Sequence, residues 1–156
     1  MAISTGQAAP QFTLFSSDKK EVSLSDYKGK NVLLLFFPQA FTGVCTAELC
    51  NIRDNIGMYN NVNAEVLAIS VDSVFTLAKF KEVQGYNFTL LSDFNKEVTI
   101  AYDALIETFA FGMKGVSKRA SFVIDKEGVI VYSEETATPG DMPNFESINA
   151  ALHVLG

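Results

Sequence analysis

The hydrophobic and polar positions of the chain alternate in a way that predicts short strands separated by amphipathic helices. The continuous apolar run Val32–Phe37 is typical of a strand buried on both faces, and Ala64–Val71 is expected to be a second such strand. Shorter strand patterns occur at Phe12–Phe15, Glu21–Leu24, Phe88–Leu91, Ser121–Ile124 and Val129–Tyr132. Apolar positions with helical spacing predict helices at about Gly43–Tyr59, Val74–Val83, Lys96–Tyr102 and Phe145–Val154.

The order of these elements predicts an α/β fold with a central mixed sheet. Strands and helices alternate through the middle of the chain, and a polar turn joins the first two strands into an N-terminal β-hairpin. Right-handed crossovers are expected to place helices on both faces of the sheet. No repeat or linker interrupts the pattern, so residues 1–156 are expected to form a single domain.

Composition and charge narrow the class of protein. The chain is 48% hydrophobic, enough for a sizeable core, and its net charge is −6. Because nucleic acids and anionic membranes attract basic surfaces, neither is expected as a partner. No apolar run approaches the roughly 20 residues of a membrane helix, and the first residues lack the pattern of a secretory signal. We therefore expect a cytoplasmic protein.

Cys45 is the first candidate for chemistry. A buried strand ends near Pro38, a short loop follows, and Cys45 lies in the first turn of the next helix. Free N–H groups and the positive end of the helix dipole stabilise a thiolate there. The alternative is a small hydrophobic core residue, because Cys45 also lies on the apolar stripe of the helix. These features alone do not decide between the two interpretations.

The second cysteine, Cys50, follows five residues later. On an ideal helix this spacing separates the two Cα atoms by about 8.6 Å. A disulfide needs Cα atoms within about 7 Å, so a Cys45–Cys50 bond would require the helix to unwind locally. The spacing also differs from the C-x-x-C of thiol–disulfide exchange proteins. Cys50 could equally be a small residue on the flank of the helix.

Metal and nucleotide chemistry are not indicated. A structural zinc ion needs four ligands, and the chain offers two cysteines and one histidine, His153. His153 is expected to cap or pack the C-terminal helix. No glycine-rich nucleotide motif occurs. We therefore expect no metal and no cofactor.

The residues around Cys45 form a family signature. Pro38, Thr42 and Cys45 have the spacing P-x-x-x-T-x-x-C, Glu48 follows three residues later, and Arg119 precedes a late strand. With these motifs the chain resembles the peroxiredoxins over essentially its whole length. It is similar both to the alkyl hydroperoxide reductase E type and, through Cys50, to the bacterioferritin comigratory protein type.

The resemblance implies a thioredoxin-like fold and a thiol peroxidase that reduces hydrogen peroxide and organic hydroperoxides. It implies that Cys45 attacks the O–O bond and becomes a sulfenic acid. Thr42 would hydrogen-bond the sulfur and the peroxide, and Arg119 would stabilise the thiolate and the charge that develops on oxygen. Pro38 would shield the pocket from water, and Glu48 would orient the arginine.

The resemblance also implies a peroxide-binding role for the backbone N–H groups of Val44 and Cys45. Phe41, beside the signature, is a candidate lining residue of the pocket. Cys50 is a candidate resolving cysteine. The reductant would be thioredoxin, a glutaredoxin-like protein or a low-molecular-weight thiol.

Two observations stand apart from the resemblance. Arg119 is one of only two arginines, and a guanidinium cannot quench a thiolate by giving up its proton. The other, Arg53, is expected to form a surface salt bridge. The segment Leu105–Met113 is unusually apolar for a loop. It either covers the core or contributes to a pocket rim or a homodimer surface, and we expect a dimer.

Three other functions compete with the thiol peroxidase. A peroxide sensor would pass its oxidation to a partner protein. A thiol–disulfide oxidoreductase is disfavoured by the cysteine spacing and by the absence of a proline before the Ser121 strand. A purely structural domain would have an unreactive Cys45.

Overall fold

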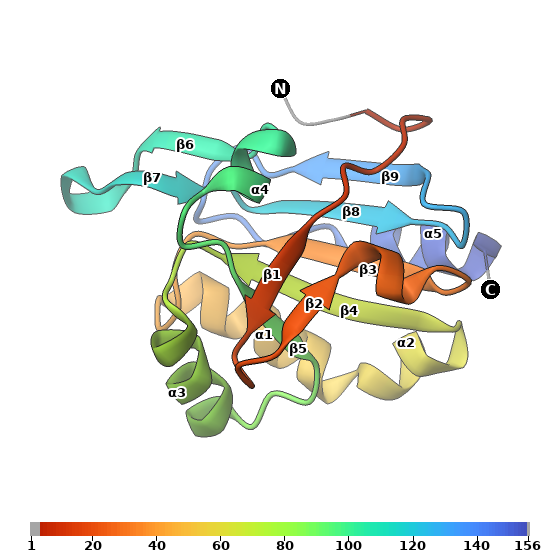
Figure 1. Cartoon of the computed structure of the whole chain (residues 1–156), viewed down its shortest axis with the longest axis horizontal. Helices are drawn as coiled ribbons and strands as arrows, with labels where there is room; N and C mark the ends of the chain where they lie inside the picture. The colour runs from red at the N-terminus through yellow and green to blue at the C-terminus, as the bar shows by residue number, and fades with distance from the viewer. Residues whose placement is uncertain (1–3, 156) are drawn as a thin grey trace.

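The computed structural model describes residues 4–155, which form a central sheet with helices packed against it (Figure 1). The strands are β1 (Thr13–Ser16), β2 (Glu21–Ser23), β3 (Asn31–Phe36), β4 (Ala64–Ser70), β5 (Thr89–Ser92), β6 (Leu105–Thr108), β7 (Lys114–Ser117), β8 (Ala120–Ile124) and β9 (Ile130–Glu135). The α-helices are α1 (Gly43–Asp54), α2 (Ile56–Asn61), α3 (Val74–Gln84), α4 (Glu97–Ala101) and α5 (Phe145–Leu155). Two 3₁₀ turns, η1 (Leu24–Tyr27) and η2 (Ala110–Gly112), complete the set.

The central sheet has seven strands in the order β2-β1-β5-β4-β3-β8-β9. β3, β4 and β5 pair in parallel, whereas β8 and β9 on one side, and β1 and β2 on the other, pair antiparallel. The predicted mixed sheet and N-terminal hairpin are therefore confirmed. In the β3–β8 register Ala120 lies beside Phe36, so the start of β8 adjoins the carboxyl end of β3.

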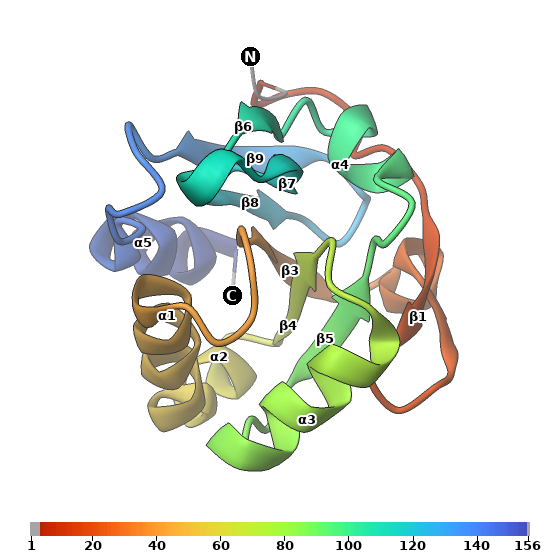
Figure 2. The same cartoon turned by 90° about the vertical axis from the view of Figure 1, so that its left-hand side faces the viewer.

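The two faces of the sheet are covered unequally (Figure 2). Side chains of α1, α2, α3 and α5 pack on the face that contains Leu33 and Leu35. The opposite face, with Val32 and Leu34, is covered by α4, η1 and the segment before β1. Because right-handed crossovers from β3 to β4 and from β4 to β5 progress in one direction, they place their helices on the same face.

The predicted helix from Gly43 to Tyr59 is wrong in one respect, because the chain forms two helices that meet at Asn55. Asn55 has φ −117° and ψ 19°, and its side-chain amide donates to the carbonyl oxygen of Asn51 at 2.8 Å. An asparagine that bonds to nearby backbone competes with the helical hydrogen-bond pattern. The apolar stripe continues across the break, which is why the sequence pattern did not reveal it.

The apolar segment from Leu105 to Met113 is not a loop. Its first part is β6, which pairs antiparallel with β7 in a separate two-stranded ribbon, with Leu105 opposite Ser117. Phe111 lies near the turn of this ribbon with φ 58°, and its side chain is 99% exposed. Phe111 therefore does not cover the core.

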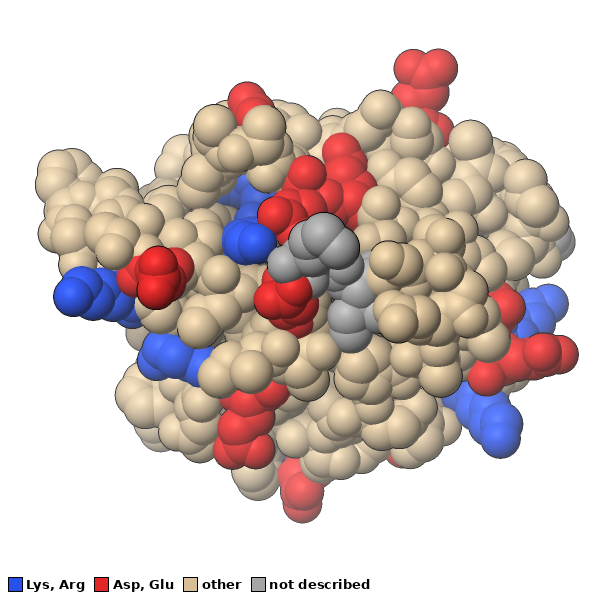
Figure 3. All heavy atoms as spheres, turned by 90° about the horizontal axis from the view of Figure 1, so that it is seen from above, with Lys and Arg blue, Asp and Glu red and all other residues tan. Residues whose placement is uncertain are grey.

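On the face shown in Figure 3 several acidic side chains gather near the middle, beside a basic group. Lysine and arginine side chains stand apart from one another on this face, with acidic side chains among them. One of the ion pairs of the structure joins Lys118 to Glu135 at 3.0 Å. Within residues 4–155, no helix is long and apolar enough to cross a bilayer.

Candidate active site

Cys45 is the third residue of α1, and its side chain is fully buried. The chain leaves β3 at Phe36, passes the buried Pro38 and enters the helix at Gly43. An α-helix leaves the N–H groups of its first turn without helical acceptors, and its dipole is positive at this end. The backbone around Cys45 therefore offers N–H donors and a positive dipole end to a group bound at this position.

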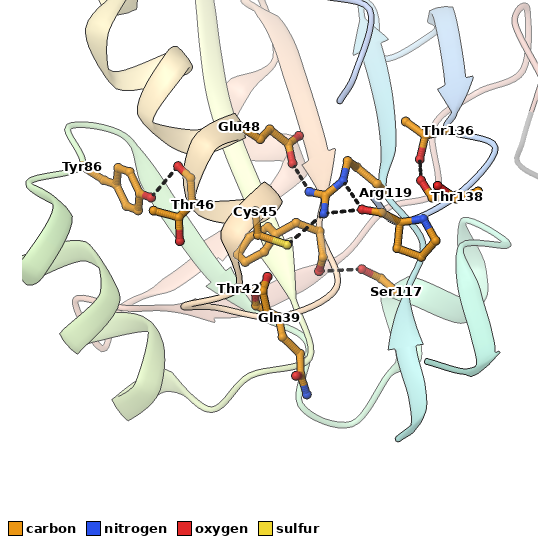
Figure 4. A network of polar contacts seen from close by, with 12 residues as sticks. Gln39, Thr42, Cys45, Thr46, Glu48, Tyr86, Ser117, Arg119, Thr136 and Thr138 are labelled. Atoms are coloured by element: carbon orange, nitrogen blue, oxygen red, sulfur yellow. Dashed lines mark hydrogen bonds and ion pairs between the residues drawn. The ribbon is translucent and has the colours of Figure 1, made fainter. Parts of the chain in front are cut away.

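Arg119 reaches the sulfur of Cys45 from the other side (Figure 4). One terminal nitrogen of the guanidinium donates to Cys45 Sγ at 3.1 Å, and the Arg119 side chain is only 2% exposed. The β3–β8 register brings Arg119 here, because the residue before Ala120 must lie near the loop that follows Phe36. Excluded from water, this cation acts on the sulfur with little screening.

The other nitrogens of Arg119 are also held. Nε donates to the carbonyl oxygen of Pro139 at 3.1 Å, and the nitrogen that faces the sulfur donates to the same oxygen at 2.8 Å. Pro139 lies in the loop between β9 and α5. No pattern of side chains in the sequence predicts this contact, because the acceptor is a backbone carbonyl oxygen.

Glu48 completes the surroundings of the guanidinium. Its side chain is fully buried, and Oε1 accepts from the remaining terminal nitrogen of Arg119 at 2.5 Å. Oε2 is buried and has no hydrogen-bond partner in the described part of the chain. Burial raises the pKa of Glu48 to about 7, against the opposing effect of Arg119, and Glu134 adds to the rise. Glu48 and a Cys45 thiolate thus share one buried cation.

Thr42 is the residue before α1 and is partly exposed. Its hydroxyl donates to the carbonyl oxygen of Gln39 at 2.9 Å, so the hydroxyl hydrogen does not go to the sulfur of Cys45. This bond fixes the orientation of the hydroxyl. The oxygen of a hydroxyl still has lone pairs that can accept a hydrogen bond from a bound molecule.

Two side chains outside the signature hold the loop that carries Pro38. Ser117 donates to the carbonyl oxygen of Phe37 at 2.8 Å. Asp72 accepts from the N–H of Ala40 at 2.8 Å and from the hydroxyl of Ser70 at 2.6 Å. Ser117 is the last residue of β7 and Asp72 follows β4, which belongs to the other sheet, so no spacing rule in the sequence identifies either residue.

Phe41 and Val44 are the residues next to Thr42 and Cys45 within the signature. Phe41 is half exposed, and its ring centroid lies 4.9 Å from that of Phe80. Its φ of 66° is unusual for a bulky side chain, and such strain is common near functional sites. Val44 is partly buried in the first turn of α1.

Cys50 lies on the same uninterrupted helix as Cys45, and both cysteines are free. Its half-buried sulfur lies 3.7 Å from Gln84 Oε1 and 3.8 Å from the hydroxyl oxygen of Tyr86. The intact helix keeps the two sulfur-bearing residues apart, as the spacing predicted.

Arg53 forms the salt bridge predicted for it, with Asp54 at 2.9 Å. It also donates to the carbonyl oxygen of Gln84 at the end of α3. His153 is exposed in the last turn of α5. Among residues 4–155, no group of three or more His, Cys, Asp or Glu side chains could hold a metal ion.

The chain is similar to known proteins over most of its length. Residues 5–133 match the AhpC/TSA family. Alkyl hydroperoxide reductase E of Mycobacterium bovis is 38% identical over 156 residues, which cover 98% of each chain. A thioredoxin peroxidase of Echinococcus granulosus is 34% identical over 165 residues, covering 99% of this chain and 81% of the relative.

The crystal structure of peroxidoxin BcpB from Mycobacterium tuberculosis is similar to the whole chain. The TM-score is 0.87 at 28% sequence identity, and the match covers 99% of both chains. This likeness confirms the thioredoxin-like fold that the sequence resemblance implied.

Proposed function

Because this chain belongs to the AhpC/TSA family and is a peroxiredoxin, we propose that Cys45 is its peroxidatic cysteine. Peroxiredoxins are thiol peroxidases, a class of oxidoreductases. The observation that carries the proposal is the 3.1 Å contact between the guanidinium of Arg119 and the buried sulfur of Cys45. A fixed cation and a helix N-terminus together favour the thiolate, which is the nucleophilic form of sulfur.

In the proposed reaction the Cys45 thiolate attacks one oxygen of the hydroperoxide. The S–O bond forms as the O–O bond breaks, the sulfur is oxidised to a sulfenic acid, and the leaving alkoxide or hydroxide takes up a proton. Arg119 stabilises the negative charge as it moves from sulfur to oxygen. The N–H groups of Val44 and Cys45 donate to the peroxide oxygens, as preorganised donors do at sites of developing charge.

The remaining signature residues have supporting roles in this proposal. The hydroxyl of Thr42, fixed by Gln39, accepts the hydrogen of the peroxide. The buried Pro38 keeps water from the sulfur, and the half-exposed ring of Phe41 lines the approach. Glu48 and the carbonyl oxygen of Pro139 hold the guanidinium in place.

We further propose that Cys50 resolves the sulfenic acid. A Cys45–Cys50 disulfide cannot form on the intact helix, so the first turns of α1 must open during each cycle. Cys50 is half-buried and free, so its sulfur becomes accessible when α1 opens.

The substrates proposed are hydrogen peroxide and organic hydroperoxides, and the reductant is a thioredoxin-type protein. Relatives named alkyl hydroperoxide reductase and thioredoxin peroxidase support these classes. A glutaredoxin-like protein and a low-molecular-weight thiol are the other reductants to compare in a turnover assay.

Rapid mixing of the reduced protein with one equivalent of peroxide, followed by intact mass, tests the proposal. We expect a fast loss of two hydrogens in the natural chain and a fast gain of one oxygen in Cys50→Ser. Cys45→Ser should not react. A reactive Cys45→Ser would refute the peroxidatic role, and a persistent gain of one oxygen in the natural chain would refute only the resolving role.

A further inference from the structure

The loop that joins β3 to α1 changes direction at Phe41. At its start Phe37 is fixed to the ribbon of β6 and β7, because its carbonyl oxygen accepts from Ser117 at 2.8 Å (Figure 4). At its end α1 begins at Gly43, and Thr42 before it is extended, with φ −84° and ψ 153°. Between these fixed points the backbone is left-handed at Phe41, whose φ is 66°.

This backbone conformation is strained, since Phe41 is not a glycine. A left-handed L residue brings its Cβ close to the following carbonyl oxygen, and bulky residues rarely adopt it. Such a conformation persists only where the surrounding contacts hold it in place. The ring of Phe41 packs against Phe80 with a centroid distance of 4.9 Å, and its exposed half faces solvent. A further contact on the backbone is therefore of interest.

Asp72 makes that contact with the backbone. Its Oδ2 accepts from the N–H of Ala40, the residue before Phe41, at 2.8 Å, and from the hydroxyl of Ser70 at 2.6 Å. The backbone of Asp72 is held as well, since its N–H donates to Ser70 Oγ at 3.2 Å and its carbonyl oxygen accepts from Ser92 at 2.6 Å. Ser70 and Ser92 are the last residues of β4 and β5, so the carboxylate is anchored to the central sheet.

On the premise of the proposed function that α1 opens before Cys50 resolves the sulfenic acid, we propose that Asp72 is a positioning residue that sets how readily α1 opens. The contact with Ala40 keeps the loop closed, and the strain at Phe41 acts in the opposite direction. When the first turn of α1 unwinds, the chain no longer has to enter a helix at Gly43, so Phe41 returns to negative φ.

The two opposing contributions suit a cycle that needs both states of the loop. The closed loop keeps Cys45 beside Arg119 for the reaction with peroxide. The open loop lets the sulfur of Cys45 meet that of Cys50. A tie without strain would hold the site closed after oxidation, and strain without a tie would open it before the peroxide reacts.

Hydrogen exchange of the reduced protein at one fixed pH tests the proposal without any peroxide. The readout is the protection of the amides of residues 46–50, the first of which donates to the carbonyl oxygen of Thr42 at 2.9 Å. We expect Asp72→Ala to lower this protection about tenfold, as for the loss of a hydrogen bond to a charged group. Asp72→Asn should lower it less, because the amide oxygen still accepts from Ala40 but carries no charge.

Phe41→Gly and Phe41→Ala test the strain. Both variants lose the ring, and they differ in that glycine adopts positive φ without strain whereas alanine does not. Protection of residues 46–50 should be about two- to tenfold higher in Phe41→Gly than in Phe41→Ala. At an unstrained position the order would be reversed, because alanine loses less conformational entropy than glycine on folding. Loss of packing therefore does not produce the expected order.

Lys19 and Asp26 provide matched controls. Lys19 has φ 65° in the turn between β1 and β2, so Lys19→Gly and Lys19→Ala carry the same difference in strain outside the loop before α1. The carboxylate of Asp26 also accepts from a backbone N–H, that of Ser23 at 2.9 Å. Protection of residues 46–50 should be equal in the two Lys19 variants and unchanged in Asp26→Ala.

The reaction with peroxide gives a second readout. Intact mass after rapid mixing should show that the sulfenic acid of Asp72→Ala converts to the disulfide about tenfold faster than that of the natural chain, by the same lost hydrogen bond. A contact with a merely structural role would not accelerate a step of the cycle when it is removed.

Two results would overturn the proposal. One is unchanged protection of residues 46–50 in Asp72→Ala, and the other is protection in Phe41→Gly that does not exceed that in Phe41→Ala. If Asp72→Ala does not fold, Asp72→Asn and the two Phe41 variants decide the question in the same way. Failure of the resolving role is separate, since it appears as a persistent gain of one oxygen after peroxide treatment, and exchange of the reduced protein does not depend on it.

Discussion

At the residue scale, one planar guanidinium serves three acceptors. Arg119 donates to Cys45 Sγ, to Glu48 Oε1 and to the carbonyl oxygen of Pro139. A lysine keeps the charge but cannot make this set of contacts, because its ammonium is a point charge on a flexible stem. We expect Arg119→Lys to lower kcat/KM for peroxide about 100-fold, the effect of losing one preorganised donor. Stopped-flow kinetics would measure it.

Lys118→Met is the control for the arginine prediction. Lys118 is the preceding residue, but its ammonium pairs with Glu135 and does not contact the sulfur. The Lys118→Met variant should therefore retain the kcat/KM of the natural chain for peroxide. Equal losses in the two variants would mean that the general positive charge of this region, and not the contact with sulfur, drives the reaction.

The buried carboxyl group of Glu48 predicts an unusual pH dependence of stability. Its pKa rises from 4.5 to about 7 on folding, mainly through burial. Between these values the folded chain keeps a proton that the unfolded chain has lost, so stability falls as the pH rises through this window. The expected loss is roughly 3 kcal/mol, from about 1.4 kcal/mol per pKa unit.

Urea denaturation of the natural chain and of Glu48→Gln at about pH 4.5 and pH 7 would check this. The free energy of unfolding of Glu48→Gln should lack the fall, because the amide does not titrate. Glu107→Gln, at an exposed position, should behave like the natural chain. If the free energy of unfolding changed with pH in the same way in all three proteins, the raised pKa of Glu48 would be contradicted.

The sequence identified those site residues that act through their side chains at fixed spacing. Cys45, Glu48 and Arg119 do lie together, and their roles in catalysis remain predictions. The contacts made by the Pro139 carbonyl and by Asp72 were missed. A backbone carbonyl has no residue preference, and a carboxylate that accepts from a loop N–H looks like any other surface acid.

At the element scale, the opening of α1 depends on the stability of its first turn. Gly43 is the first residue of this helix, its φ is not positive, and no atom lies within 4 Å of a Cβ placed there. Alanine at such a site stabilises the ordered state by about 0.4–1 kcal/mol. We therefore expect Gly43→Ala to slow disulfide formation about two- to fivefold, as measured by intact mass after rapid mixing with peroxide.

Gly57→Ala is the matched control. Gly57 lies in the first turn of α2, is equally exposed and is also free of contacts at the Cβ position. Alanine at position 57 adds a similar preference for helix, but outside the segment between the cysteines. The rate of disulfide formation should therefore be unchanged. If both variants slow the reaction, general stability and not local opening sets the rate.

The elements themselves were predicted best where apolar runs are long. β3 and β4 agree with the sequence pattern to within one residue at each end. The ribbon of β6 and β7 was missed, because these two strands pair only with each other and half of the β6 residues are exposed. Nothing in its pattern distinguishes it from an apolar loop.

At the scale of the whole molecule, Phe111 predicts self-association. Its ring is 99% exposed near the turn of the β6–β7 ribbon, on a backbone with positive φ. An exposed aromatic on a protruding ribbon is typical of an interface. We expect a homodimer in light scattering after gel filtration, and a monomer for Phe111→Ser.

Phe75→Ser provides the comparison for the dimer. Phe75 is also exposed, at 74%, but it lies at the start of α3. This variant should remain dimeric. A natural chain that is monomeric at high concentration would contradict the prediction.

The arrangement of the layers could be predicted only in part. Alternation of strands and helices gave a mixed sheet with helices on both faces, which the fold confirms. The unequal cover of the faces follows from the spatial order β3-β4-β5, and strand order is set by contacts between residues far apart in the chain. No local pattern contains that information.

The anchoring of Arg119 by the carbonyl oxygen of Pro139 has a consequence for how the loop between β9 and α5 tolerates change. Replacing side chains leaves a carbonyl in place, so an alanine scan of residues 136–142 should find most positions silent. Inserting or deleting one residue shifts the carbonyl and should release the guanidinium. This loop is therefore expected to accept varied sequences at a constant length, and to be intolerant of any change in that length.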